Sequence, residues 1–336
     1  MLRTSCMADR CCDSASQVSF KADKSTRHQP TSHYKYNIQT NTLTTYPNHH
    51  ITSHHTLTTM SPQPNPNFLP SKAPSGAKYH KIDFTTSNPP LPEFKNRFAA
   101  VIDNILTEEE CNELIRLAEA STVTPQSPTP VWERAMINVG NGKQKLATDT
   151  RNCGRIIWDT PELADKLLNR LMPFLREFEI DRLENRPLVT GLAGRNKTYR
   201  LTRLNERLRF LRYEGGEYFR PHWDASYTTP DRKEKSFFTV HLYLNGDGEQ
   251  DLKELRREQA RVERGEGDVN LGVGGKLLGG ATSFLPRFEE KERHLRVFPK
   301  AGSVLVFQHN DLLHAGDSVF RGTKLTMRTD ILYQEL

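Results

Sequence analysis

The chain has 336 residues, of which 35% are hydrophobic, so it holds enough material for one large folded domain or two small ones. Its formal net charge is +6, but residues 1–80 contain eight basic and three acidic residues, which leaves only +1 for residues 81–336. The composition therefore gives no basic excess of the kind that binds nucleic acid. No run of 18 apolar residues is present, and we expect no membrane span.

The cysteines form no metal-binding or disulfide pattern. Cys6, Cys11 and Cys12 lie in a polar N-terminal stretch, whereas Cys111 and Cys153 lie in sequence typical of a folded domain. None of them has the spacing of zinc ligands, and we expect reduced thiols. The N-terminus also lacks the apolar core of a secretory signal. These features predict an intracellular protein, cytoplasmic or nuclear.

Residues 1–90 are rich in Ser, Thr, Pro, Asn and His and contain few clustered apolar residues. Such a segment buries too little surface to offset the entropy of ordering it, so we predict that it is disordered. Met60 is a more typical start, which leads to the hypothesis that residues 1–59 are not translated. The folded domain is then expected over residues 91–336, with its core over residues 207–336.

Two helices are predicted ahead of the strand-rich part of the chain. Residues 98–106 are typical of a strand that leads into a helix. Thr107 and Glu110 have the spacing of a capping box, in which each side chain accepts a hydrogen bond from the backbone of the other. We expect this helix to support the domain by packing against a sheet.

A second strand and helix follow in the same way. Residues 151–158 indicate a strand, after which Asp159 or Thr160 caps a helix that has Pro161 in its first turn. Pro173 lies within the apolar pattern of this helix and is expected to kink it or split it in two.

From residue 207 onward, short strands dominate the pattern. The polar stretch 182–206 ahead of them is expected to be a mobile lid or an ordinary solvated loop. Residues 249–266 are charged and helix-prone, and we expect a surface helix inserted between two strands. The expected strands include 237–244, 295–298, 303–307 and 324–333. Short antiparallel strands around a pocket, with helices earlier in the chain, fit a jelly roll.

The stretch 209–227 holds the first candidate metal ligands. His222 and Asp224 are two residues apart, so on a strand their side chains would point to the same face while Trp223 points away. Two imidazoles and one carboxylate form the facial triad of non-haem Fe(II) sites, which leaves three coordination positions open. His314, after an apolar strand, is the candidate for the second imidazole, and Lys324 follows it by ten residues.

These residues belong to an ordered set of motifs. The set comprises His222-Trp-Asp224, Gly279-Gly-Ala-Thr-Ser-Phe284, His314-Ala-Gly-Asp-Ser-Val319 and Gly322-Thr-Lys324. It resembles the prolyl 4-hydroxylase branch of the Fe(II)/2-oxoglutarate dioxygenases. The resemblance covers residues 98–334. It implies a mainly β fold, a double-stranded β-helix (jelly roll) core with N-terminal support helices.

The resemblance also implies roles for individual residues. His222, Asp224 and His314 would bind Fe(II), and Lys324 would bind the 5-carboxylate of 2-oxoglutarate. Tyr243 matches a tyrosine that helps to hold this carboxylate, and Tyr213 matches a pocket tyrosine of the prolyl 4-hydroxylases. The cofactors implied are Fe(II), 2-oxoglutarate as cosubstrate, O2, and ascorbate as reductant.

Strand alternation leaves one assignment open. Lys324 and Arg328 share a face of their strand, so Arg328 is an alternative or additional anchor for 2-oxoglutarate. His309 and His241 are competing imidazoles for the second ligand, although His241 is expected to line the pocket instead. Trp223 is expected to belong to the core.

The function implied is hydroxylation of an unactivated C–H bond, with conversion of 2-oxoglutarate to succinate and CO2. The motifs concern iron and cosubstrate, so the prime substrate is either a peptide, as in prolyl hydroxylation, or a small metabolite. A peptide predicts a long open groove, and a metabolite predicts a closed apolar pocket. An alternative of another class is a non-catalytic jelly-roll binding module. A zinc hydrolase could also use two histidines and one aspartate, but it would give Lys324 no role.

Overall fold

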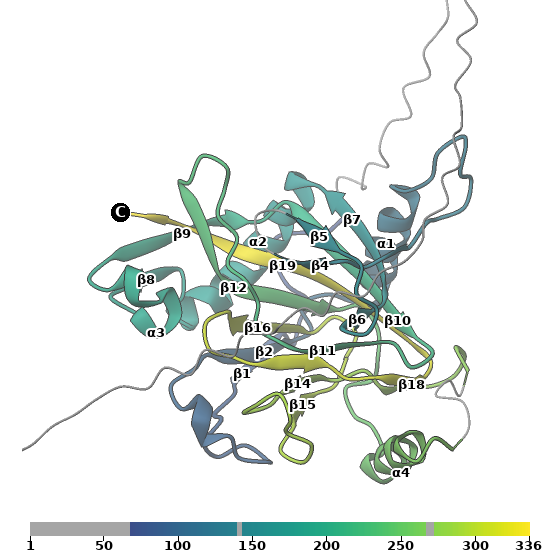
Figure 1. Ribbon diagram of the computed structural model, residues 1–336. Helices are drawn as coiled ribbons and strands as arrows, with labels where there is room; N and C mark the ends of the chain where they lie inside the picture. The colour runs from purple at the N-terminus through teal and green to yellow at the C-terminus, as the bar shows by residue number, and fades with distance from the viewer. Residues whose placement is uncertain (1–67, 140–142, 267–271) are drawn as a thin grey trace, which may run out of the picture. The chain divides into compact units, whose positions relative to one another are not determined.

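The computed structural model describes residues 68–139, 143–266 and 272–336 (Figure 1). The predictions for residues 1–67, including the hypothesis on residues 1–59, lie outside this range. Two antiparallel sheets dominate the described part, and in Figure 1 the centre of the larger sheet lies above the smaller sheet.

The larger sheet has ten strands. Its main path runs through β1 (Lys78–Lys81), β2 (Ala99–Asp103), β16 (Val304–Gln308), β12 (Glu234–Tyr243), β19 (Thr323–Glu335), β10 (Arg207–Glu214), β7 (Gly154–Asp159) and β3 (Glu133–Arg134). Off this path, β9 (Thr198–Leu204) pairs with β19, and β8 (Arg182–Glu184) pairs with β9. The long strand β19 therefore lies at the centre of the sheet.

The smaller sheet has five strands. They follow the order β15 (Leu295–Val297), β14 (Thr282–Phe284), β17 (His314–Gly316), β11 (Tyr218–His222) and β6 (Arg151–Asn152). Two further pairs are β13 (Leu278–Gly279) with β18 (Val319–Arg321), and β4 (Ile137–Asn138) with β5 (Gln144–Lys145). Two antiparallel sheets with a pocket between them confirm the predicted jelly roll.

The predicted support helices cover the larger sheet. Helix α1 (Glu108–Ala120) begins at the predicted capping box, because Thr107 Oγ1 accepts from the Glu110 amide and the Glu110 carboxylate accepts from the Thr107 amide. Helix α2 (Pro161–Glu177) is not split at Pro173. The buried leucines on both sides of Pro173, Leu171 and Leu175, stay packed in the core, which offsets the hydrogen bond that proline removes.

The remaining helices are short or peripheral. They are α3 (Pro187–Thr190), α4 (Leu252–Glu263), and the 3-10 turns η1 (Pro92–Phe94) and η2 (Leu192–Gly194). Helix α4 confirms the surface helix predicted within residues 249–266. No helix in the described ranges is long and apolar enough to cross a membrane.

Alternation along β12 separates the core from the pocket. Phe238, Val240 and Leu242 point into the apolar core that the larger sheet shares with α1 and α2. Thr239 and His241 point the other way and line a pocket between the two sheets. The same strand thus stabilises the fold with one face and supplies polar groups with the other.

Three expectations need correction. Residues 68–90 are not disordered, because β1 pairs with β2 and Leu69 and Phe84 are buried against the domain. Residues 182–206 are neither a lid nor a loop, since β9 pairs along the central strand β19. The strand expected at residues 151–158 is divided at Cys153, where the chain passes from the smaller sheet to the larger one.

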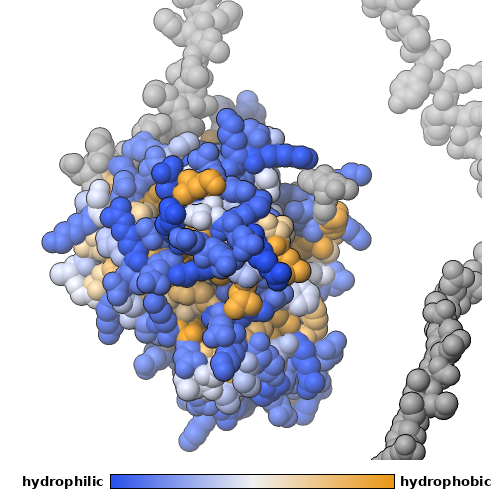
Figure 2. Space-filling view, turned by 90° about the vertical axis from the view of Figure 1, so that its left-hand side faces the viewer, coloured by the Kyte–Doolittle hydropathy of each residue, from blue (hydrophilic) through white to orange (hydrophobic). Residues whose placement is uncertain are grey.

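The surface of the described part is mostly hydrophilic on the side that faces the left of Figure 1. Figure 2 shows hydrophobic residues there in small patches separated by hydrophilic ones. Among the hydrophobic side chains exposed on the described part, Trp223 is 53% accessible. The expectation that Trp223 belongs to the core is therefore wrong, because it lies on the loop that follows β11.

Candidate functional site

Two histidines face each other across the smaller sheet. Strand β11 pairs with β17 so that His222 lies directly opposite His314, and their ring centroids are 4.4 Å apart. Strand β11 ends at His222, so Asp224 lies on the following loop and not on the strand that we predicted. The three side chains still converge, and their candidate ligand atoms all lie within 4.8 Å of one another.

Backbone carbonyls fix the orientation of both imidazoles. His222 Nδ1 lies 2.8 Å from the Arg220 carbonyl oxygen, and His314 Nδ1 lies 3.0 Å from the Leu312 carbonyl oxygen. A carbonyl oxygen only accepts, so in each neutral ring Nδ1 carries the proton and Nε2 has a free lone pair. A hydrogen bond from the ring nitrogen that does not bind the metal commonly orients histidine ligands in this way.

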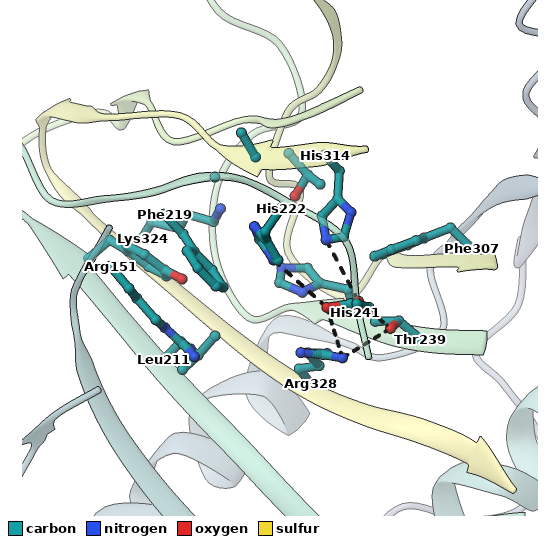
Figure 3. Close-up of a pocket in the computed structure, with 15 residues that line it drawn as sticks. Arg151, Leu211, Phe219, His222, Thr239, His241, Phe307, His314, Lys324 and Arg328 are labelled. Carbon is teal, nitrogen blue, oxygen red and sulfur yellow. Dashed lines mark hydrogen bonds and ion pairs between the residues drawn. The ribbon is translucent and has the colours of Figure 1, made fainter. Parts of the chain in front are cut away.

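The carboxylate of Asp224 completes the cluster. Its oxygens lie 3.7 Å from His222 Nε2 and 3.6 Å from His314 Nε2, which is beyond hydrogen-bond range. On the opposite side, Oδ2 accepts a 2.6 Å hydrogen bond from Thr239, and Oδ1 lies 3.0 Å from Arg328 Nη2. Figure 3 shows the two histidines reaching from one sheet toward Thr239 and Arg328 on the other.

The charge state of this cluster suits a cation. Burial and the neighbouring His314 lower the pKa of His222 to about 3, and burial also lowers the pKa of His314. Burial would raise the pKa of Asp224, but Arg328 and the imidazoles outweigh it and hold this pKa well below its usual range. Two neutral nitrogen lone pairs therefore face a carboxylate with no proton between them. This donor set fits a divalent metal such as Fe(II).

A buried cation lies at the inner end of the same pocket. Lys324 is 2% exposed and is the direct register partner of Tyr213 across β19 and β10. Its ammonium lies 5.1 Å from the Tyr213 ring centroid and 6.0 Å from that of Tyr243. Within the described residues no carboxylate forms an ion pair with it. Burial lowers the pKa of Lys324 to about 8, so an anionic ligand would relieve an unpaired buried charge.

The glycine motif makes room for this lysine. Gly280 has a φ of +70°, and a Cβ there would lie 3.1 Å from Lys324 Cδ and 3.0 Å from Val319 Cγ2. A side chain at this position would therefore press on the lysine stem. Beside it, Tyr243 donates a 2.8 Å hydrogen bond to Thr282 Oγ1, which places two hydroxyl groups in the region of the ammonium.

Arg328 lies farther along the same face of β19 and is engaged differently. Its Nη2 lies 3.0 Å from Asp224 Oδ1 and 3.3 Å from Asp330 Oδ1. Lys324 and Arg328 both line the pocket, but only Arg328 is paired with carboxylates.

Several lining residues were missed in the sequence. Arg151 on β6 is buried, has an Nε without a hydrogen-bond partner, and lies 4.6 Å from the Phe219 ring centroid. Phe219 stacks on His222 with a centroid separation of 3.6 Å, and Phe307 lies 4.7 Å from His314. Phe219 lies on β11 with His222, whereas Arg151 and Phe307 lie on other strands and carry no motif, so only the fold brings these two to the pocket.

The competing histidines lie outside the cluster. His241 lines the pocket, as predicted, with a buried Nε2 that has no hydrogen-bond partner. His309 is buried next to Asp330, at 3.7 Å, and lines a neighbouring hollow.

Two hollows adjoin the pocket. One, of about 460 Å³, runs between α4 and β11 and shares Phe219 and Gly316 with the pocket. The other, of about 410 Å³, shares Asp224 with it. Phe288 of the first hollow meets Trp223 of the second edge to face, with centroids 4.9 Å apart. The two hollows therefore both lie next to the pocket of the candidate metal ligands.

Comparison with known proteins agrees with this site. Residues 208–329 match the family model of the 2OG-Fe(II) oxygenase superfamily, where 2OG is 2-oxoglutarate. The matched residues include both histidines, Asp224 and Lys324. No curated protein matches the chain. The predicted resemblance is confirmed at the level of the superfamily: residues 208–329 form a 2-oxoglutarate- and Fe(II)-dependent oxygenase domain, which uses Fe(II), 2-oxoglutarate and O2.

Several solved structures are similar to the chain. A viral collagen prolyl hydroxylase from Paramecium Bursaria Chlorella virus-1, in complex with 2OG, is 18% identical with a TM-score of 0.35 and covers 77% of this chain and 97% of its own. A prolyl-4-hydroxylase of Pseudomonas putida is 16% identical with a TM-score of 0.40, covering 71% and 95%. A prolyl hydroxylase of Trichoplax adhaerens, in complex with a hypoxia inducible factor peptide fragment, is 14% identical with a TM-score of 0.41, covering 71% and 85%. At these values the likenesses say nothing about the substrate of this chain.

Proposed function

We propose that His222, Asp224 and His314 bind Fe(II) in this domain and that Lys324 anchors 2-oxoglutarate. The convergence of two Nε2 lone pairs on one carboxylate supports the metal assignment. The unpaired buried ammonium at the inner end of the pocket supports the cosubstrate assignment. The functional unit includes residues 68–90 as well as residues 91–336, because the earlier segment supplies strand β1 and buried core residues.

When bound, Fe(II), 2-oxoglutarate and O2 supply the oxidising power that converts a C–H bond of the prime substrate to C–OH while 2-oxoglutarate becomes succinate and CO2. Ascorbate serves as the external reductant. The residues of the chain bind and orient these groups. Lys324 is the cationic partner of the far carboxylate of 2-oxoglutarate, and Tyr243 and Tyr213 flank it.

Aromatic residues shield the site from water. Phe219 covers one face of His222, and Phe307 packs against His314. A pocket walled in this way strengthens electrostatic contacts inside it, since water no longer screens them. Lys324 is itself 2% exposed, so its attraction for a carboxylate is stronger than it would be in solvent.

We further propose that the prime substrate is a peptide, in keeping with prolyl 4-hydroxylase-like motifs. The two hollows that adjoin the pocket of the candidate metal ligands support this assignment, since a small metabolite would need only a closed pocket. Arg220, which stacks 4.3 Å from the Tyr218 ring centroid, lines the first hollow, and Trp223 lines the second. These two side chains would contact the peptide on either side of the reacting residue.

Succinate release tests this proposal. The full chain would be incubated with Fe(II), 2-oxoglutarate, ascorbate and O2, alone and with capped proline-containing peptides or with free proline. We expect peptides to raise succinate formation above the basal level, and Trp223→Ala to lower the peptide response while basal turnover persists. Stimulation by free proline or other small metabolites, with no response to any peptide, would favour the metabolite-tailoring alternative.

A further inference from the structure

Asp224 belongs to a series of alternating buried charges. Arg328 Nη2 lies 3.0 Å from Asp224 Oδ1 and 3.3 Å from Asp330 Oδ1. Arg209 Nη1 lies 3.2 Å from Asp330 Oδ2. The order of charges is therefore positive, negative, positive, negative, and it ends at the carboxylate that faces the two imidazoles. Asp224 and Asp330 are 8% and 3% exposed, so solvent does little to screen these charges.

The position of Asp224 explains why it needs such support. Strand β11 ends at His222, so the ladder hydrogen bonds that orient His222 and His314 do not extend to Asp224. Its side chain is held from the opposite sheet instead. Thr239 on β12 donates to Oδ2, and Arg328 on β19 contacts Oδ1. Each carboxylate oxygen thus has one fixed donor, which leaves its other side directed at the imidazoles.

The contacts of Arg328 all use one nitrogen. Nη2 reaches Asp224, Asp330 and the Thr239 hydroxyl, the last at 3.3 Å. Arg328 is four residues beyond Lys324 on β19, a distance of about 13 Å along a strand. The two cations therefore lie at different ends of the pocket. Of these two, only Lys324 lacks a carboxylate partner within the described ranges.

We infer that Arg328 is a positioning residue that holds Asp224 in place for the metal, with Asp330 and Arg209 holding Arg328 in turn, and that Arg328 does not anchor 2-oxoglutarate. This inference rests on the proposed function, because it concerns the carboxylate that the proposal assigns to the metal. Loss of an outer contact to a metal ligand typically weakens metal binding about 10- to 100-fold.

The test is a pair of titrations on the full chain. Co(II) binding is followed by its visible absorption in wild type, Arg328→Gln, Arg328→Lys and Lys324→Gln. 2-Oxoglutarate binding is then measured calorimetrically on each protein saturated with Co(II). We expect Arg328→Gln to weaken Co(II) binding about 10- to 100-fold and to leave the 2-oxoglutarate affinity within about twofold. Lys324→Gln should instead leave Co(II) binding unchanged and weaken 2-oxoglutarate binding.

Two further variants separate positioning from general damage. Arg328→Lys keeps a single charged nitrogen, which is all that the contacts use, so it should recover part of the Co(II) affinity. Arg207→Gln removes an exposed arginine of the neighbouring strand β10, paired with Asp159, and should bind Co(II) like wild type. If Arg328→Gln does not fold, the charge-balanced double variant Arg328→Gln/Asp330→Asn takes its place. It should show the same loss of Co(II) affinity.

The outcomes are distinct. Unchanged Co(II) affinity in folded Arg328→Gln would overturn the inference, and so would a loss confined to 2-oxoglutarate binding. Failure of the wild-type chain to bind Co(II) at all would instead remove the proposed metal site itself.

Discussion

His222 on β11 lies directly opposite His314 on β17, with ring centroids 4.4 Å apart and each Nδ1 directed at a backbone carbonyl oxygen. His222→Ala should therefore abolish metal binding and succinate formation while the fold persists, because the fold does not depend on this partly exposed ring. Co(II) titration and circular dichroism check both statements. His241→Ala, a matched imidazole in the same pocket, should still bind Co(II); loss of binding there alone would place the ligand at position 241.

Lys324→Ala should weaken 2-oxoglutarate binding about 10- to 100-fold, because a hydrogen bond to a charged group contributes about 1.5–3 kcal/mol. Metal affinity should be unchanged, since the ammonium has no contact with His222, Asp224 or His314. Calorimetric titration of 2-oxoglutarate into the Co(II)-loaded protein measures the effect. An unchanged dissociation constant would show that another group holds the cosubstrate.

The affinity for 2-oxoglutarate should fall as the pH rises. Burial lowers the pKa of Lys324 to about 8, so the lysine is charged at pH 7 and becomes neutral above pH 8. Only the charged form attracts the carboxylate, and the dissociation constant should rise about tenfold per pH unit beyond this pKa. Binding measured from pH 7 to pH 9.5 tests this, with Lys324→Ala as a weak and flat reference. A flat wild-type profile would contradict it.

Arg170 ties both support helices to the start of the described chain. It is 1% exposed, pairs with Glu110 at 2.7 Å, and donates to the carbonyl oxygens of Ile105 and Pro70. Arg170→Ala should destabilise the fold by about 3–5 kcal/mol, because it leaves a carboxylate and two carbonyls without their partner. Denaturant unfolding measures this change.

The exposed pair of Arg116 with Glu113 on α1 provides the control for that measurement. Arg116→Ala should change the free energy of unfolding by less than about 1 kcal/mol, since an exposed ion pair contributes little. Equal effects of the two substitutions would show that Arg170 has no special role in joining the helices.

Much of the fold could be predicted because local rules decide it. The capping box of Thr107 and Glu110 marks the start of α1, and the alternation of β12 places Thr239 and His241 toward the pocket. Segments that depend on distant partners were missed. Residues 68–90 have too few apolar residues to fold alone, but β2 and the helices provide a surface for them. Similarly, β9 is polar yet pairs along β19.

The candidate site likewise contains residues that local sequence patterns mark and residues that only distant partners place. Short motifs with fixed spacing marked His222, Asp224, His314 and Lys324, and the structure brings the first three together. Strand alternation does not account for Asp224, because Asp224 lies beyond β11 and its carboxylate is held by side chains of the other sheet. Arg151 could not be assigned to the pocket, because no sequence pattern links it to residues that it meets only in three dimensions.

Anaerobic spectroscopy probes the proposed Fe(II) and 2-oxoglutarate site itself. Fe(II) and 2-oxoglutarate would be added to the full chain without O2, and the visible difference spectrum recorded. We expect a weak metal-to-ligand charge-transfer band that needs both additions, is absent in His222→Ala and forms only at higher 2-oxoglutarate concentration in Lys324→Ala. Folded wild-type protein that binds Fe(II) and 2-oxoglutarate but gives no such band would contradict it.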